Sequence, residues 1–119
     1  MDLDESFEAK ITVERSKFFA ILAPAASLAE IKALLAKRRR TIKKANHHCW
    51  AARLGSGGEH ARDDGEVGKP GQRILEVLRQ HELFGVLIVS RVYGGVKLGP
   101  AGVGRAFRNA ARQVVEHIR

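Results

Sequence analysis

Apolar and polar residues alternate along this chain of 119 residues in a pattern that predicts four strands. Alternation with a period of two is the signature of a strand that buries one face. The last run, which contains GVLIVS, alternates little, and this is typical of a central strand covered on one or both faces. The predicted strands are residues 7–15, 17–22, 48–54 and 85–93.

Three other segments repeat apolar residues at the spacing of a helix. The first begins at the capping-box pair Ser27 and Glu30, and we expect it to end in the basic tract KRRRTIKK, residues 37–44. The second is expected to start near residue 70. The third runs from about residue 100 to residue 118 and presents an apolar stripe to the core.

These elements predict an α+β fold in the order β-β-α-β-α-β-α. We expect a two-layer sandwich, with a mixed four-stranded sheet that carries its helices on one face. Residues 55–69 are polar and rich in glycine, so they are expected to form a loop. The chain has no repeat and no linker composition, and residues 1–119 are therefore expected to form a single domain.

Composition narrows the class of protein. Cys49 is the single cysteine, which excludes an intrachain disulfide and fits a reducing compartment. The first ten residues are acidic and polar, unlike a secretory signal, and no apolar run reaches the roughly 18 residues that a membrane span needs. We therefore expect a cytoplasmic protein with no membrane partner.

The chain is strongly basic, with a formal net charge of +8 and a sequence pI of about 10.3. A domain of this charge is attracted to phosphate-rich surfaces such as RNA or a ribonucleoprotein. The alternative is a basic surface that serves only solubility. Charge alone does not separate the two.

A second concentration of glycines follows the last predicted strand, in RVYGGVKLGPAGVGRAF, residues 91–107. Pro100 marks a helix start, where free N–H groups and the helix dipole favour an anion, and Lys97 adds a charge. Glycines at this point would allow a phosphate to come close; they are Gly94, Gly95 and Gly99. The alternative is that the glycines only permit a tight turn and close packing, which suits Gly102 and Gly104 on the helix.

Two nucleotide motifs are excluded by this segment. A Walker A loop requires Lys and Ser or Thr after its last glycine, but Pro100 follows Gly99. A dinucleotide fingerprint requires a third glycine and a position ahead of the helix, and the pair Gly102 and Gly104 provides neither. Nucleotide hydrolysis and NAD binding are not expected, and we expect no cofactor.

A row of cations follows on the last predicted helix, at Arg105, Arg108 and Arg112, opposite the apolar stripe. If the loops at residues 62–71 and 93–99 lie side by side, Lys69, Lys97 and Arg105 would surround one shallow anion-accepting pocket. The row could also be a solvated helix face. Arg105 could instead pair with an acid of the first loop and hold the two loops together.

The remaining candidate chemistry lies in HHC at residues 47–49 and in the sequence DDGE. Neighbouring strand residues point to opposite faces, so only one of the two histidines can face a given site, and we expect no metal. The loop acids could form a general acid–base cluster, but aspartates in a glycine-rich loop more often cap backbone N–H groups. No nucleophile accompanies them, so no catalytic residue is assigned. The candidate loop residues are His48, Asp63, Asp64, Gly65 and Glu66.

Several short motifs together resemble the N-terminal domain of the IMPACT (YigZ) family, over nearly the whole chain. They are SKF at 16–18, HHCWA at 47–51, DDGE at 63–66, RVYGGVKLG at 91–99 and RAF at 105–107. The resemblance implies a fold like that of domain two of ribosomal protein S-five. It also implies a role in translational control for the eukaryotic members and association with nucleic acid or the ribosome for the bacterial ones.

This chain departs from the family pattern in the two loops. Residues 66–73 are one residue shorter than the family motif, and Lys69 and Pro70 replace its Thr-Ala pair. Residues 100–104 read PAGVG where the family has Ala-Gly-Gly-Leu-Val. These changes lie in the motif loops rather than in the core, so we expect them to alter or remove the binding of any ligand that the family loop holds.

Three hypotheses follow from the residues and the resemblance. The first is a non-enzymatic binding module for RNA or a ribosome-associated surface. The second is a protein-interaction domain that engages a translation regulator. The third is an enzyme that acts on a phosphorylated small molecule through His48, Asp63 and Asp64.

Overall fold

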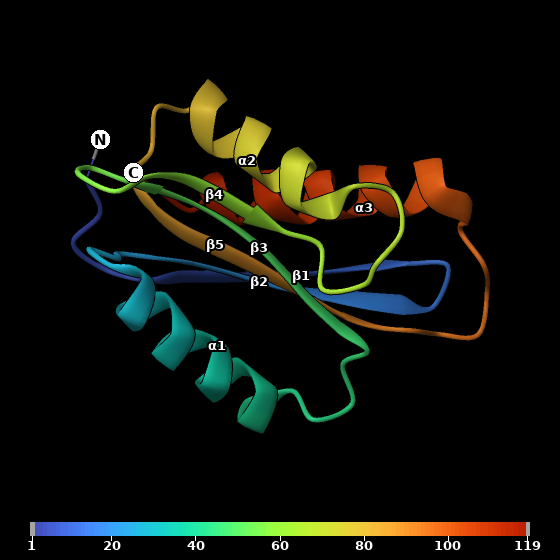
Figure 1. Cartoon of the computed structure of the whole chain (residues 1–119). Coiled ribbons are helices and arrows are strands. Elements are labelled where there is room, and N and C mark those ends of the chain that lie inside the picture. The colour runs from blue at the N-terminus through green and yellow to red at the C-terminus, as the bar shows by residue number, and fades with distance from the viewer. Residues whose placement is uncertain (1, 119) are drawn as a thin grey trace.

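The structure forms one sheet from five strands, flanked by three helices (Figure 1). It is a computed structural model that describes residues 2–118. All seven predicted elements are present, which confirms the α+β class. The elements in chain order are β1 (Phe7–Val13), β2 (Ser16–Ala23), α1 (Leu28–Thr41), β3 (His47–Leu54), β4 (Gly58–Arg62), α2 (Pro70–Gln80), β5 (Gly85–Val92) and α3 (Gly99–Val115).

The fifth strand, β4, lies inside the segment that was predicted to be a loop. Its sequence GEHAR contains no buried residue and no apolar alternation. It forms the edge of the sheet and pairs only with β3, where Ala61 lies opposite Ala51. An edge strand needs hydrogen bonds on one side only, so its sequence gives little period-two signal.

The sheet is antiparallel, and the prediction of a mixed sheet was wrong. The strand order is β1-β2-β5-β3-β4, and each neighbouring pair of these strands is antiparallel. The hairpin of β3 and β4 explains the difference, because it reverses the chain before α2. Without that reversal, β3, α2 and β5 would form a parallel crossover unit.

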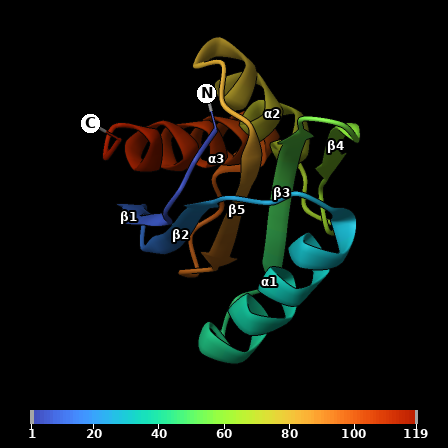
Figure 2. The same cartoon turned by 90° about the vertical axis from the view of Figure 1, so that its left-hand side faces the viewer.

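The helices lie on both faces of the sheet, and the prediction of a single covered face was also wrong. Figures 1 and 2 show α2 and α3 on one side of the sheet and α1 on the other. The central strands require this arrangement, because successive residues point to opposite faces. Leu87 and Val89 of β5 join the core under α2 and α3, whereas Val86 and Ile88 join the core under α1.

The two cores differ in size and in composition. The core under α2 and α3 is the larger and contains an edge-to-face pair of Phe18 and Phe107, whose ring centroids are 5.1 Å apart. The core under α1 is smaller, and the helix enters it mainly through Ile31 and Leu35. Trp50, the single tryptophan, lies in this smaller core.

The helix ends follow the sequence signals closely. Ser27 Oγ accepts a hydrogen bond of 3.2 Å from the Glu30 N–H, which confirms the capping prediction for α1. The helix ends at Thr41, inside the basic tract. Within residues 2–118, no helix combines the length and apolarity that crossing a membrane would require.

Candidate functional site

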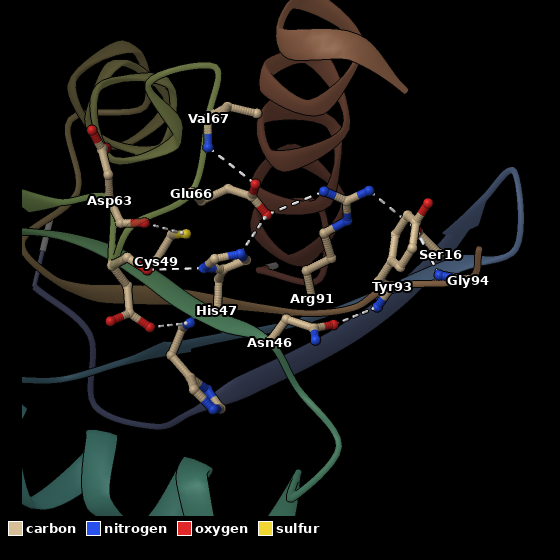
Figure 3. Close-up of polar contacts among 12 residues, drawn as sticks. Ser16, Asn46, His47, Cys49, Asp63, Glu66, Val67, Arg91, Tyr93 and Gly94 are labelled. Atoms are coloured by element: carbon tan, nitrogen blue, oxygen red, sulfur yellow. Dashed lines mark hydrogen bonds and ion pairs between the residues drawn. The ribbon is translucent and has the colours of Figure 1, made fainter. Parts of the chain in front are cut away.

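The DDGE loop (residues 63–69) and the glycine loop (residues 93–99) lie side by side where β5 leads into α3 (Figure 3). A Cβ added to Gly68 would collide with the Pro100 carbonyl oxygen in the first turn of α3. A Cβ added to Gly104 would lie 2.7 Å from the Gly68 carbonyl oxygen. The close-packing role proposed for Gly104 is therefore real, because the helix start and the DDGE loop touch through backbone atoms.

Gly94 anchors the glycine loop to the hairpin of β1 and β2. Its N–H donates to Ser16 Oγ at 3.2 Å, and a Cβ at this position would collide with the backbone of Arg15. Gly95 and Gly99 differ, because an added Cβ at either would meet open space, although both have positive φ of 89° and 72°. Only these two glycines leave the loop surface open to an approaching group.

A buried ion pair joins the DDGE loop to β5, and sequence reasoning did not assign it. Arg91 of β5 is 6% exposed, and its Nη1 lies 3.2 Å from Glu66 Oε2. Its Nη2 donates to Ser16 Oγ at 3.3 Å. The guanidinium also lies over the rings of Phe18 and Tyr93, 5.6 and 5.4 Å from their centroids. An arginine inside a strand predicted to be central requires an acidic partner. The position of Arg91 in the sequence was therefore a signal from which a buried ion pair could have been predicted.

The DDGE loop holds Glu66 in position through a tight turn. The Glu66 N–H donates to the Asp63 carbonyl at 2.9 Å, and the turn residues Asp64 and Gly65 have φ of 49° and 74°. His47 Nδ1 donates to the Asp64 carbonyl at 2.9 Å, which leaves Nε2 3.7 Å from Glu66 Oε2. His47 is therefore the histidine that faces this site.

His48 faces the opposite side of the sheet. Its ring Nδ1 lies 2.7 Å from Ser90 Oγ, and both residues are buried. Burial, with a smaller contribution from Arg39, lowers the pKa of His48 below its usual 6.5. Its contact with the DDGE loop is made by the backbone, since the His48 N–H donates to Asp64 Oδ2 at 2.8 Å.

Asp63 caps α2 rather than facing a reactant. Its Oδ1 accepts a hydrogen bond of 2.8 Å from the Gly71 N–H in the first turn, where the N-cap residue Lys69 offers no side-chain acceptor. The ring of His48 and the carboxylates of Asp63 and Asp64 are thus bound to separate partners. The acid–base hypothesis requires these three side chains to converge on one point, and they do not.

Cys49 is fully buried beneath the DDGE loop, and its Sγ donates to the Asp63 carbonyl at 3.1 Å. Burial raises the pKa of the Cys49 thiol far above its usual range, and nearby Glu66 raises it further. Within residues 2–118, no three histidine, cysteine or acidic side chains are grouped so that they could hold a metal ion.

Two of the predicted cations, Lys69 and Lys97, belong to the two loops, and the three arginines follow along α3. Lys97, Arg105 and Arg112 are exposed, and Arg108 is half-buried with an unpartnered Nε. None of the four forms an ion pair within the part of the chain that the structure describes. Lys69 is exposed in a left-handed conformation with φ of 54°.

Arg105 does not hold the two loops together. The acids of the DDGE loop are bound elsewhere: Asp63 to the Gly71 N–H, Asp64 to the His48 N–H and Glu66 to Arg91. The alternative role of Arg105 was therefore wrong. Among the described residues, Glu66 pairs instead with Arg91 at the end of β5.

A shallow groove lies between the loops, with a volume of about 470 Å³. It contains Lys97 and Gly99, as expected, but Lys69 and Arg105 do not line it. Its walls are mostly apolar, and they are formed by Val67, Tyr93, Leu98, Pro100 and Val103, with Arg91 also contributing. The predicted anion-accepting pocket is thus an apolar groove with a cationic rim.

Comparison with known sequences identifies relatives over most of the chain. The family described as the Impact N-terminal domain matches residues 14–115. An IMPACT family member of Thermus thermophilus is 39% identical over 104 residues, covering 87% of this chain and 56% of the relative. One from Haemophilus influenzae is 33% identical, covering 89% of this chain and 54% of the relative. The chain spans little more than half the length of these two relatives.

Two solved structures are also similar. A crystal structure of a hypothetical protein superposes with a TM-score of 0.91 at 26% identity, covering 98% of this chain and 59% of that one. A structure described as that of the two-domain translational regulator Yih1 gives a TM-score of 0.56 at 25% identity. It covers 98% of this chain and 48% of that one.

Proposed function

This chain belongs to the IMPACT family, and on that premise we propose that it is a non-enzymatic binding module linked to the control of translation. Its target is RNA or a ribonucleoprotein surface. The contact is made by the α3 row, defined as Lys97, Arg105, Arg108 and Arg112, together with the glycine loop. The structural similarity to a protein described as a translational regulator supports the link to translation.

The observation that carries the proposal is the row of unpaired cations on α3. Arg105 and Arg112 are seven residues apart and therefore lie on one side of the helix, away from the core. No acid of the described chain neutralises them. Unpaired exposed cations release the counterions of a nucleic acid on binding, which favours association at low salt.

A second basic surface, the α1 tract, provides the natural comparison. It consists of the exposed residues Lys37, Arg39, Arg40, Lys43 and Lys44. Arg39 and Arg40 lie in the last turn of α1, where cations stabilise the helix by complementing its dipole, and Arg112 has the same position in α3. The head of the α3 row differs, because it lies at a helix N-terminus, where Lys97 adds to positive potential. The α3 row is therefore the better anion site.

The test is a titration of labelled structured RNA at two salt concentrations, followed by fluorescence anisotropy. The double variant Arg105→Gln/Arg112→Gln should weaken binding and reduce the salt slope by about two, because each lost phosphate contact lowers it by about one. The matched control Arg39→Gln/Arg40→Gln removes the same charge and should change the slope less. Absence of binding at low salt, or equal effects of the two double variants, would contradict the proposal.

The groove favours a second candidate, a protein-interaction domain that engages a translation regulator. Val67 and Tyr93 are 52% and 45% exposed, which is unusual for large apolar side chains gathered in one groove. If RNA fails to bind at low salt, this candidate replaces the first. A pull-down with a recombinant translation regulator, repeated with Tyr93→Ala, would test it directly.

A further inference from the structure

The groove between the two loops is more apolar than a phosphate site requires. Val67 and Tyr93 in the groove and Val96 beside it are three of the four large apolar side chains exposed within residues 2–118. Scattered exposed apolar residues are ordinary, but a cluster beside a concave surface marks an interaction site. The groove volume of about 470 Å³ is suited to one small organic group.

The aromatic wall of the groove is fixed before any ligand binds. The Tyr93 N–H donates to Asn46 Oδ1 at 2.8 Å, which attaches the start of the glycine loop to the segment before β3. The buried guanidinium of Arg91 lies over the ring, and the Glu66 carboxylate holds that guanidinium in place. Figure 3 shows the Tyr93 ring beside this network. A half-exposed ring held in this way can accept a flat partner with little loss of entropy.

The groove also carries positive charge. Lys97 lines it and forms no ion pair within the described residues. The groove also contains the first residues of α3, Gly99 and Pro100, and this helix has no side-chain cap and no acid in its first turn. The positive end of the helix dipole and the Lys97 ammonium therefore act on the same small volume.

We infer that the groove holds a single unpaired nucleotide of an RNA, with the base stacked on Tyr93 and its phosphate beside Lys97 and the start of α3. The inference rests on the proposed function, and it adds that the protein binds unpaired RNA in preference to paired RNA. The base supplies the flat group that the ring accepts, and the phosphate supplies the negative charge. The remaining strand continues along the α3 row.

An acidic peptide is the competing occupant, and the geometry favours it less. The groove lies at the junction of a strand end and a helix start, so it offers no free sheet edge with which an extended peptide could pair. The cations that continue from Lys97 along α3 match the regular charge of a nucleic-acid backbone.

The experiment compares a labelled ten-nucleotide oligouridylate with a blunt ten-base-pair RNA duplex by fluorescence anisotropy. The wild-type chain should bind the single strand more tightly. Tyr93→Ala should weaken single-strand binding by about 5- to 150-fold, the range that corresponds to loss of one base–aromatic stack, and should leave the salt slope unchanged. Tyr93→Phe should restore binding, and Leu28→Ala, which changes an exposed apolar residue at the start of α1, should have little effect.

The possible failures are distinguishable. If both RNAs bind with a salt slope sensitive to the α3 row but Tyr93→Ala has no effect, the inference is overturned while the proposed function stands. If neither RNA binds at low salt, both are overturned. If an acidic phenylalanine-containing peptide binds in a Tyr93-dependent way and oligouridylate does not, the groove is a peptide site. Thermal melting of each variant checks that it is folded. We expect the Tyr93 variants to fold, because this side chain is 45% exposed.

Discussion

The two faces of the sheet use the same strands for different tasks. On the α2 and α3 face, Arg91 and Glu66 form an ion pair whose side chains are 8% and 5% exposed. On the α1 face, Arg38 and Glu8 form an ion pair in which the Arg38 side chain is also 8% exposed, but the Glu8 side chain is 66% exposed. The first pair joins the DDGE loop to the end of β5, and the second joins α1 to the edge strand β1.

The comparison teaches that burial of the acid, rather than distance, should decide what an ion pair contributes, since the two arginines are equally buried. The pair with the exposed acid is the shorter, at 2.9 Å against 3.2 Å for the pair with the buried acid. Water solvates the exposed Glu8 carboxylate and screens its attraction to Arg38. The buried Glu66 carboxylate has no such screening, so its attraction to Arg91 is the stronger.

Replacing the acid of each ion pair by alanine tests this expectation directly. It should give the largest change in the free energy of unfolding. Glu66→Ala should lower the free energy of unfolding by about 3–5 kcal/mol, because it leaves Arg91 charged and buried. Glu8→Ala should lower it by less, because the carboxylate that it removes is solvated and screened, although Arg38 is left as buried as Arg91. Urea denaturation followed by circular dichroism measures both. An equal or larger cost for Glu8→Ala would show that burial of the acid does not control these pairs.

Two glycine variants extend the comparison and should give the second largest change in the free energy of unfolding. Gly68→Ala should lower the free energy of unfolding by about 1–3 kcal/mol, because φ is +85° and the added Cβ meets the start of α3. Gly55→Ala is the matched control, since a Cβ there meets open space, and it should be close to neutral. The same denaturation measurement applies. If the two variants cost the same, the close contact between the DDGE loop and α3 is not important for stability.

The smallest effect concerns the α1 face and depends on pH. Folding lowers the pKa of His48, mainly through burial, so the unfolded chain takes up a proton that the folded chain resists. The free energy of unfolding should therefore fall as the pH is lowered through about 6.5, the pKa of an unfolded histidine, until the folded-state pKa is passed. His48→Gln should remove this part of the pH dependence. Parallel pH profiles for the two proteins would contradict the assignment.

Much of the fold could be predicted from the sequence, because seven elements carry local signals. The capping residues of α1 and the apolar run of β5 are examples, and both elements lie where they were expected. The strand β4 could not be predicted, since its hydrogen bonds come from β3 and its side chains are not buried. Missing that strand also led to the wrong sheet direction.

The candidate site was predictable in part. The glycine loop, the α3 row and the exposed Lys97 follow from local sequence. The pairing of Arg91 with Glu66 does not, because the two residues are 25 positions apart and several acids could have served. The apolar character of the groove was also out of reach, since Val67 and Tyr93 come from different loops and meet only in the folded chain.

The most direct test of the central claim is to map RNA binding onto the two faces by backbone amide NMR. Adding structured RNA to the ¹⁵N-labelled chain at low salt should shift resonances of the glycine loop and of α3, residues 93–112, and leave α1 nearly unchanged. The α1 tract serves as an internal control, because it is at least as basic as the α3 row. Shifts concentrated in residues 37–44, or absent from both segments, would contradict the assignment of the interface to α3.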